Sequence, residues 1–131
     1  FSPKMNDGAS IMALTYYGST RYMQSYNVMG VAKAALETSI RYLSVDMGDR
    51  GIRVNAISAG PMRTLAGAVI NKSRKIYNYT IENSPIKKPL SLEDIGKSSV
   101  YLMSDLSKGV TGEILYVDNG YNNVGMSIQE L

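Results

Sequence analysis

Tyrosine and lysine, two residue types that can act in acid–base chemistry, stand seven positions apart in this chain. Tyr26 and Lys33 lie at the start of a helical pattern, and a second tyrosine, Tyr16, precedes Tyr26 by ten residues. Seven residues make nearly two helical turns, so side chains at 26 and 33 would differ by only about 20° around the axis. Because helical side chains lean toward the N-terminus, Lys33 would point back toward Tyr26. We therefore expect a phenol hydrogen-bond donor whose pKa the nearby cation holds below its usual value of about 10.

The same pair would also suit an ordinary surface helix, with an exposed tyrosine and an extended lysine. Composition narrows the alternatives, because the 131 residues include no histidine and no cysteine. The commonest general base and metal ligand is therefore missing, and so are disulfides and thiolate metal sites. Acid–base chemistry must fall to tyrosine, lysine or carboxylates, and we expect no metal site.

We also expect a protein that binds neither nucleic acid nor membrane, and a cytoplasmic location, which the lack of cysteine fits. The net charge is +3, but the basic residues are scattered, whereas a nucleic-acid-binding protein gathers them on one arm or face. No apolar run reaches the roughly 18 residues that a membrane-spanning helix needs. The start of the chain shows no basic-then-apolar leader, which is the mark of a secretory signal.

Strand and helix patterns alternate along the chain. The apolar run at residues 9–15 lies between glycines, as in a strand buried on both faces. A helix follows over residues 26–47, with apolar positions three or four apart and Gly48 and Gly51 at its end. This apolar stripe consists of Met29, Ala32, Leu36, Ile40, Leu43 and Met47.

The second half of the chain continues this alternation. Residues 52–58 show the alternating pattern of a strand, and residues 114–117 form a last short one. Between them, Ser91-Leu92-Glu93-Asp94 resembles a capping box that opens a helix reaching about Leu106. The sequence therefore predicts an α/β fold with a doubly wound, Rossmann-like parallel sheet. In such sheets ligands bind at the carboxyl ends of the strands, where Tyr16 and residues 59–64 would lie.

One expected element of a dinucleotide-binding fold is missing. No glycine-rich turn joins a first strand to a first helix, although that turn normally seats the pyrophosphate. We therefore interpret residues 1–131 as the C-terminal half of a single Rossmann-like domain. Residues 65–89 form a long connection that begins small and apolar, and connections of that length usually have a function.

Two sequence motifs carry a resemblance to a known family. The segment Tyr26-Asn27-Val28-Met29-Gly30-Val31-Ala32-Lys33, together with residues 53–61 and Thr64, resembles the bacterial NADH-dependent enoyl-acyl-carrier-protein reductases of type II fatty-acid synthesis. These enzymes are a branch of the short-chain dehydrogenase/reductase superfamily. Ordinary members carry Tyr four residues before the Lys and Ser thirteen before that Tyr. Here those places hold Met29 and Tyr16, a double departure typical of the enoyl reductase branch.

The resemblance, which runs from about Gly8 to Leu131, implies a reductase that transfers hydride from NADH to the 2,3 double bond of trans-2-enoyl thioesters. It implies that Tyr26 binds the thioester oxygen, that Lys33 binds the nicotinamide ribose and that Tyr16 lines the pocket. It also implies a substrate-binding lid over residues 62–89, a homotetramer and an acyl-carrier protein as partner. The cofactor-binding residues it implies are Lys33, Met62, Arg63, Thr64, Leu65 and Ala66.

Two other interpretations of the chain's function remain open. An ordinary ketoreductase of the same superfamily would have tyrosine at position 29, and a non-catalytic remnant could keep the fold without the activity.

The lid region carries several basic residues and one acidic residue, Glu82, between Leu65 and Lys88. These would dock an acidic carrier protein, or would simply keep a loop soluble. They are Lys72, Arg74, Lys75, Lys87 and Lys88.

Overall fold

A sheet of three parallel strands forms the centre of the computed structural model, which describes residues 4–62 and 73–125. The strands are β1 (Ser10–Thr15), β2 (Arg53–Ala59) and β3 (Ile114–Val117), in the order β1-β2-β3. Ser10 pairs with Arg53 and Thr15 with Ser58, while Ala56 pairs with Ile114 and Ala59 with Val117. The predicted parallel sheet is therefore confirmed.

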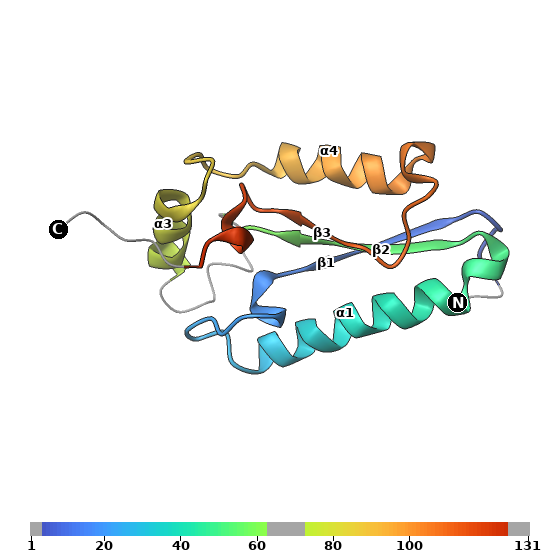
Figure 1. Cartoon of the computed structure of the whole chain (residues 1–131), viewed down its shortest axis with the longest axis horizontal. Helices are drawn as coiled ribbons and strands as arrows, with labels where there is room; N and C mark the ends of the chain where they lie inside the picture. The colour runs from blue at the N-terminus through green and yellow to red at the C-terminus, as the bar shows by residue number, and fades with distance from the viewer. Residues whose placement is uncertain (1–3, 63–72, 126–131) are drawn as a thin grey trace.

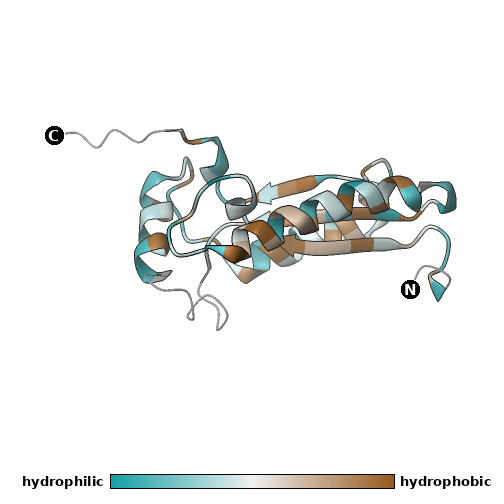
Figure 2. Ribbon diagram, turned by 90° about the horizontal axis from the view of Figure 1, so that it is seen from below, coloured by the Kyte–Doolittle hydropathy of each residue, from teal (hydrophilic) through white to brown (hydrophobic). Residues whose placement is uncertain are grey.

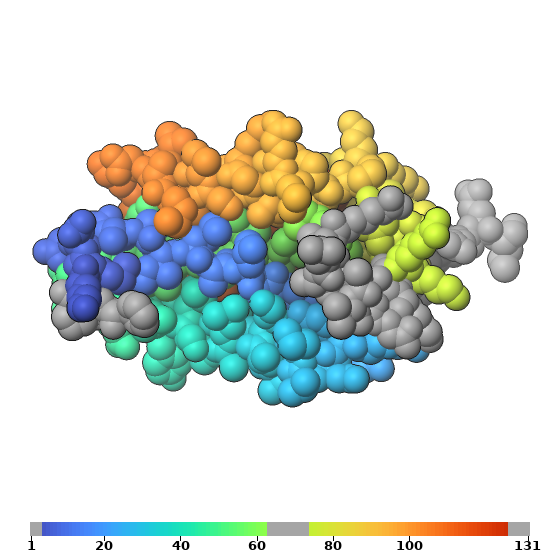
Figure 3. Space-filling model, turned by 180° about the vertical axis from the view of Figure 1, so that it is seen from behind, coloured from blue at the N-terminus to red at the C-terminus, as the bar shows by residue number. Residues whose placement is uncertain are grey.

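Helices cover both faces of this sheet. Helix α1 (Val28–Asp46) lies on one face and α4 (Leu92–Met103) on the other, as Figure 1 shows. Ile40 of α1 packs with Ile52, Val54 and Ala56 in one core cluster, whereas Ile57 of β2 packs with residues of α4 in the other. Figure 3 shows the same layers from behind, with β1 between α4 and α1. This is the doubly wound arrangement.

The central strand β2 differs from the alternation expected for residues 52–58. Residues 54–58 are all buried, so the strand has no solvent-facing side. Both of its faces are covered by helices, and strands in that position are buried on each side. Buried Asn55 is structural here, because its amide donates to Val110 O at 2.9 Å and its oxygen accepts from Glu113 N at 3.0 Å. The side chain thus joins β2 to the segment before β3.

Helix α1 begins and packs differently from the prediction. It starts at Val28 rather than at residue 26, and Met29 and Leu43 of the predicted stripe are exposed. The buried positions are Glu37, Ile40 and Ser44. The predicted stripe included Leu36 and Leu43, each one residue before a buried position. Apolar periodicity could not indicate Glu37 and Ser44, because these two polar side chains are buried with hydrogen-bond partners. Of the two glycines predicted to end the helix, Gly51 has the left-handed conformation, at φ 66°, and it follows the short turn η3 (Gly48–Arg50).

The connection between β2 and α4 contains a helix that the sequence did not reveal. Helix α3 covers Ser73–Asn83, within the predicted lid of residues 62–89. Its first residues directly follow a part of the chain outside the described residues. The serine, threonine, tyrosine and asparagine content of this segment gives a weak helical signal, since these residues are indifferent helix formers. The predicted lid is therefore partly helical and not one long loop.

The predicted capping box is confirmed. Ser91 Oγ accepts from the Asp94 backbone N–H at 3.1 Å, and the Asp94 carboxylate accepts from the Ser91 N–H at 3.0 Å. The helix ends at Met103, three residues before the predicted end, and the turn η4 (Asp105–Ser107) follows.

No helix of the described residues is long and apolar enough to cross a membrane. Within the same residues, no group of histidine, cysteine or acidic side chains is placed to hold a metal ion.

Candidate active site

The predicted site residues gather at the carboxyl ends of β1 and β2. Tyr16 directly follows β1 and precedes the short turn η2 (Tyr17–Ser19), while Met62 follows β2 after Gly60 and Pro61. Parallel strands end on the same edge of the sheet, which is where open α/β sheets bind their ligands. Figure 1 shows η2, the start of α1 and helix α3 at this end of the molecule.

Tyr16 and Tyr26 are in direct contact. Their ring centroids are 5.0 Å apart and their planes meet at 66°, an edge-to-face arrangement that aromatic pairs favour. Two glycines permit this approach. A Cβ on Gly18 would lie 2.6 Å from the Tyr26 ring, and one on Gly30 would lie 2.8 Å from Gly18 O. A larger residue at position 18 would displace the Tyr26 ring, and one at position 30 would displace the backbone at Gly18.

Tyr26 lies in a turn and not on the helix, which corrects the helical-face prediction. Ser25 and Asn27, on each side of it, have positive φ values of 67° and 46°, and a helix cannot run through such residues. The Tyr26 carbonyl accepts the Met29 N–H at 3.0 Å as α1 begins. The seven-residue spacing from Tyr26 to Lys33 therefore does not describe one face of a helix.

Lys33 contacts the strand rather than the phenol. Its ammonium donates to Leu14 O at 2.8 Å, across the junction between α1 and the end of β1. An ammonium carries three N–H donors, so this bond leaves the group able to bind ligand hydroxyls. The expected depression of the Tyr26 pKa by Lys33 was wrong, because burial instead raises the pKa of Tyr26.

The pKa of Tyr16 is raised more strongly. Its phenol is the more buried of the two, and this burial is the main cause, followed by the phenols of Tyr26, Tyr121 and Tyr17. An ordinary phenol already titrates near pH 10. Both candidate phenols therefore remain protonated at neutral pH and can donate a hydrogen bond to a substrate oxygen.

A buried acidic residue lies beside these groups, and sequence reasoning missed it. Glu37 is only 4% exposed, and its carboxylate accepts the hydroxyl hydrogen of Thr15 at 2.7 Å. Thr15 is the last residue of β1, and Glu37 lies one helical turn after Lys33. Lys33 and Glu37 thus hold two consecutive residues of β1, directly before Tyr16. A glutamate within an apolar helical pattern was the signal that could have indicated this pair.

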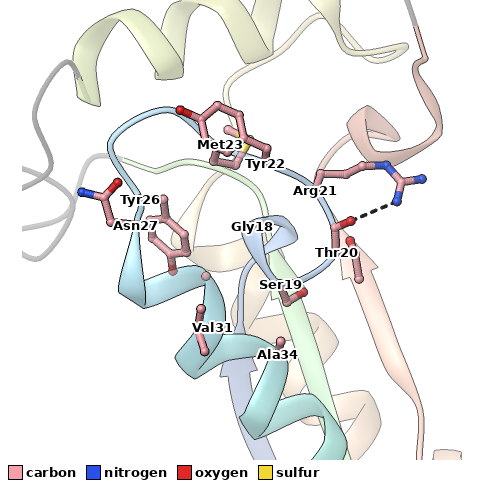
Figure 4. Close-up of a pocket in the computed structure, with 11 residues that line it drawn as sticks. Gly18, Ser19, Thr20, Arg21, Tyr22, Met23, Tyr26, Asn27, Val31 and Ala34 are labelled. Atoms are coloured by element: carbon pink, nitrogen blue, oxygen red, sulfur yellow. Dashed lines mark hydrogen bonds between the residues drawn. The ribbon is translucent and has the colours of Figure 1, made fainter.

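An open cleft of about 530 Å³ adjoins Tyr26. Figure 4 shows Tyr26, Val31 and Ala34 on the α1 side of this cleft and Thr20 and Arg21 opposite them. Tyr16 and Lys33 are not among its lining residues. The cleft therefore reaches only one member of the trio, and does not by itself define the active site.

Of the predicted cofactor-binding segment, Met62 is described and residues 63–66 lie outside the described residues. Met62 is half-buried and packs against the cluster of Ile57, Ile95 and Leu102. Gly60 before it lies so close to Asp118 that a Cβ would come within 3.0 Å of the Asp118 Cα. The turn after β2 is therefore tightly fixed at the end of the sheet.

Most of the predicted basic surface is exposed. Arg74 and Lys75 lie on α3, and Lys87 and Lys88 lie on the segment that follows it. Lys72 lies outside the described residues. The side chains on the described part are thus accessible to an acidic partner.

The sequence pattern of a family described as "Enoyl-(Acyl carrier protein) reductase" matches residues 1–122. The chain belongs to this enoyl-(acyl carrier protein) reductase family. Enoyl-[acyl-carrier-protein] reductase [NADH] 1 of Rhizobium meliloti is 61% identical over 122 residues, which cover 93% of this chain and 45% of the relative. The corresponding protein of Rickettsia typhi is 54% identical over 123 residues, with 94% and 47% covered.

Solved structures of the reductase family share this fold. The crystal structure of the enoyl-(acyl-carrier-protein) reductase from Anaplasma phagocytophilum, in complex with NAD, has a TM-score of 0.91 and 50% identity, and the match covers 98% of this chain and 49% of that one. The FabI structure from Candidatus Liberibacter asiaticus has a TM-score of 0.86 and 58% identity, with 89% and 45% covered. The chain therefore spans about half the length of the family members that it matches.

Proposed function

We propose that this chain is the C-terminal half of an NADH-dependent enoyl-acyl-carrier-protein reductase of type II fatty-acid synthesis. The complete protein would reduce the 2,3 double bond of trans-2-enoyl thioesters. The observation that carries the proposal is the contact of Tyr16 with Tyr26, 5.0 Å between ring centroids, beside Lys33 at the carboxyl end of β1. Position 29, where an ordinary ketoreductase would have its tyrosine, holds an exposed methionine.

The residues of this site suit the chemistry of enoyl reduction. NADH would supply the hydride for the β-carbon, while negative charge develops on the thioester oxygen. Tyr26 would donate a hydrogen bond to that oxygen, and such a bond accelerates the reaction because it strengthens as the charge develops. Burial, which raises the pKa of Tyr26, keeps this donor protonated. Tyr16 would line the pocket and take part in proton delivery to the α-carbon.

The described residues also suit the binding of a nicotinamide nucleotide. Lys33 presents an ammonium at the end of the sheet where such ligands bind, with donors beyond the one that holds Leu14 O. Its role would be to bind the ribose hydroxyls. Met62 to Ala66 would line the cofactor, with Met62 fixed against the core by its packing and the Thr64 hydroxyl on a phosphate. The hydride chemistry itself belongs to the cofactor.

The partners that we propose are an acyl-carrier protein and three further copies of the same chain in a cytoplasmic homotetramer. The carrier would approach α3, where Arg74 and Lys75 are exposed. Subunits would pack against the apolar side of α1 that faces away from the sheet, visible as brown segments in Figure 2. Its members are Val28, Val31, Ala35, Tyr42 and Val45, all exposed.

The proposal is tested by the substrate preference of the full-length protein. We expect NADH oxidation with crotonyl thioesters and none with acetoacetyl thioesters, since the latter need a ketoreductase. Activity on acetoacetyl thioesters alone would favour the ketoreductase reading. Inactivity on both substrates, with normal folding and NADH binding, would favour a non-catalytic remnant.

A further inference from the structure

The turn after β3 places a further tyrosine, Tyr121, at the same end of the sheet as the catalytic candidates. Asp118, which is buried, directly follows β3 and accepts the backbone N–H groups of Gly120 and Asn122, each at 2.9 Å. Asn119 and Gly120 have φ values of 58° and 82°, which asparagine and glycine tolerate best. The turn is thus fixed by its own hydrogen bonds, and Tyr121 begins η5 (Tyr121–Asn123).

This turn is attached to the segment that follows α3. Ile86 N donates to Asn119 O at 3.2 Å, and the Asn119 side-chain amide donates to Lys88 O at 2.7 Å. Gly120 packs so closely on Pro85 that a Cβ would lie 3.0 Å from its Cγ. Figure 1 shows η5 at the same end of the molecule as α3. The turn and the second half of the predicted lid are therefore held together.

On its other side, Tyr121 contacts the turn that carries Tyr16. The rings of Tyr121 and Tyr17 are 5.7 Å apart between centroids, with planes at 73°. Tyr17 directly follows Tyr16 and opens η2. Burial raises the pKa of Tyr121, and the phenols of Tyr79 on α3 and of Tyr17 raise it further. Tyr121 is thus close to phenols from two other elements, α3 and η2.

We propose that Tyr121 is a positioning residue of the reductase site, whose ring braces the Tyr16–Tyr17 turn against the segment that follows α3. The inference rests on the proposed function, and it adds a residue that lies more than 80 positions from the catalytic trio in the sequence. Tyr121 acts through Tyr17 on the orientation of Tyr16. It does not touch the reacting atoms. Its effect arises because small displacements of a catalytic group are costly to the rate.

The test compares kinetics of four variants in the full-length protein: Tyr121→Ala, Tyr121→Phe, Tyr16→Phe, and Tyr16→Phe combined with Tyr121→Ala. The matched control is Tyr101→Ala, which removes a partly exposed ring from α4. Each protein is assayed with crotonyl coenzyme A and NADH. NADH binding is measured without substrate, and thermal unfolding confirms that each variant is folded at the assay temperature.

We expect Tyr121→Ala to lower kcat by about tenfold to a hundredfold and to leave NADH affinity unchanged. Tyr121→Phe keeps the ring and should keep the activity, as should Tyr101→Ala. In the Tyr16→Phe background, Tyr121→Ala should cost little more, because residues that act through one another are not additive. Unchanged kcat in Tyr121→Ala, or multiplied losses in the double variant, would overturn the inference. Inactivity of the unmodified protein would instead reject the proposed function, and the inference with it.

Discussion

The ammonium of Lys33 lies 2.8 Å from the carbonyl oxygen of Leu14 and donates a hydrogen bond to it. One turn further along α1, Glu37 accepts the hydroxyl hydrogen of the next residue of the strand, Thr15. The helix therefore holds the last two residues of β1 with two side chains of opposite charge. Tyr16 follows directly, so the position of its ring depends on both contacts.

Tyr26→Phe and Lys33→Met should affect different steps. Tyr26→Phe would remove the proposed hydrogen bond to the developing oxyanion, and loss of such a donor costs about 10²- to 10³-fold in turnover in the best-studied case, and less where water replaces the phenol. Lys33→Met keeps an unbranched side chain that is one atom shorter and removes its donors, so it should weaken NADH binding. Steady-state kinetics and direct titration of NADH separate the two effects. Unchanged NADH affinity in the Lys33 variant would refute the role assigned to that lysine.

Thr15→Val should destabilise the protein by about 1–3 kcal/mol, because it leaves the buried Glu37 carboxylate without its hydroxyl donor. The two side chains have nearly the same shape, so packing changes little. Thr15→Ser is the matched control, since it keeps the hydroxyl. Denaturant unfolding of the full-length protein measures the difference, and equal stability of the Val and Ser variants would contradict it.

The free energy of unfolding should fall as the pH rises above about 10. The pKa values of Tyr16 and Tyr26 are raised in the folded state, so the folded protein holds these phenol protons more tightly than the unfolded chain. This stabilisation is fully present below the unfolded pKa and is lost as the pH rises through the folded pKa. Each phenol contributes a slope of at most about 1.4 kcal/mol per pH unit.

Unfolding in denaturant from about pH 8 to about pH 11 measures this slope. Tyr16→Phe should make it shallower, because phenylalanine has no proton to lose. An identical pH dependence in the variant would show that Tyr16 does not contribute to it.

Val31→Glu should weaken self-association of the full-length protein. Val31 is 70% exposed and Val45 is 79% exposed, whereas the buried positions of α1 are Glu37, Ile40 and Ser44. A helix that is apolar on two faces is expected to be covered on both, and a buried unpaired carboxylate is costly. Sedimentation at micromolar concentration should show a tetramer for the unmodified protein and smaller species for the variant. Asn6→Glu, at an exposed position before β1, is the control, and a monomeric unmodified protein would contradict the proposal.

Reversing Arg74 and Lys75 to glutamate should raise KM for carrier-bound substrate and weaken its dependence on salt. Complementary charge mainly speeds encounter, and salt screens it over a Debye length of about 8 Å at physiological ionic strength. The coenzyme A thioester should be reduced at nearly the same rate at moderate ionic strength. The control is the double reversal of Lys97 and Lys108 to glutamate. It makes the same change of net charge on α4 and at the end of the turn η4 that follows it. If both substrates lose equally, these residues shape the pocket instead of docking the carrier.

Much of the fold followed from the sequence because its signals are local. The predicted last strand, Ile114–Val117, and the capping box of Ser91 and Asp94 agree with the structure. A short apolar run bounded by glycines indicates the strand, and the hydrogen bonds of the capping box join residues only three positions apart. Helix α3 was missed because its composition gives little helical preference. The start of α1 was misplaced because the left-handed conformations of Ser25 and Asn27 have no periodic signal.

The sequence by itself determined which residues could do chemistry: Tyr16, Tyr26 and Lys33, on an α/β framework whose alternating elements bring strand ends together. Only the tertiary structure decided what these residues contact. Lys33 binds Leu14, nineteen positions away, Thr15 binds Glu37 across 22 positions, and Tyr17 meets Tyr121 from the far end of the chain. Periodicity records the geometry of a single helix or strand, whereas these contacts and the resulting pKa shifts depend on how separate elements pack and exclude water.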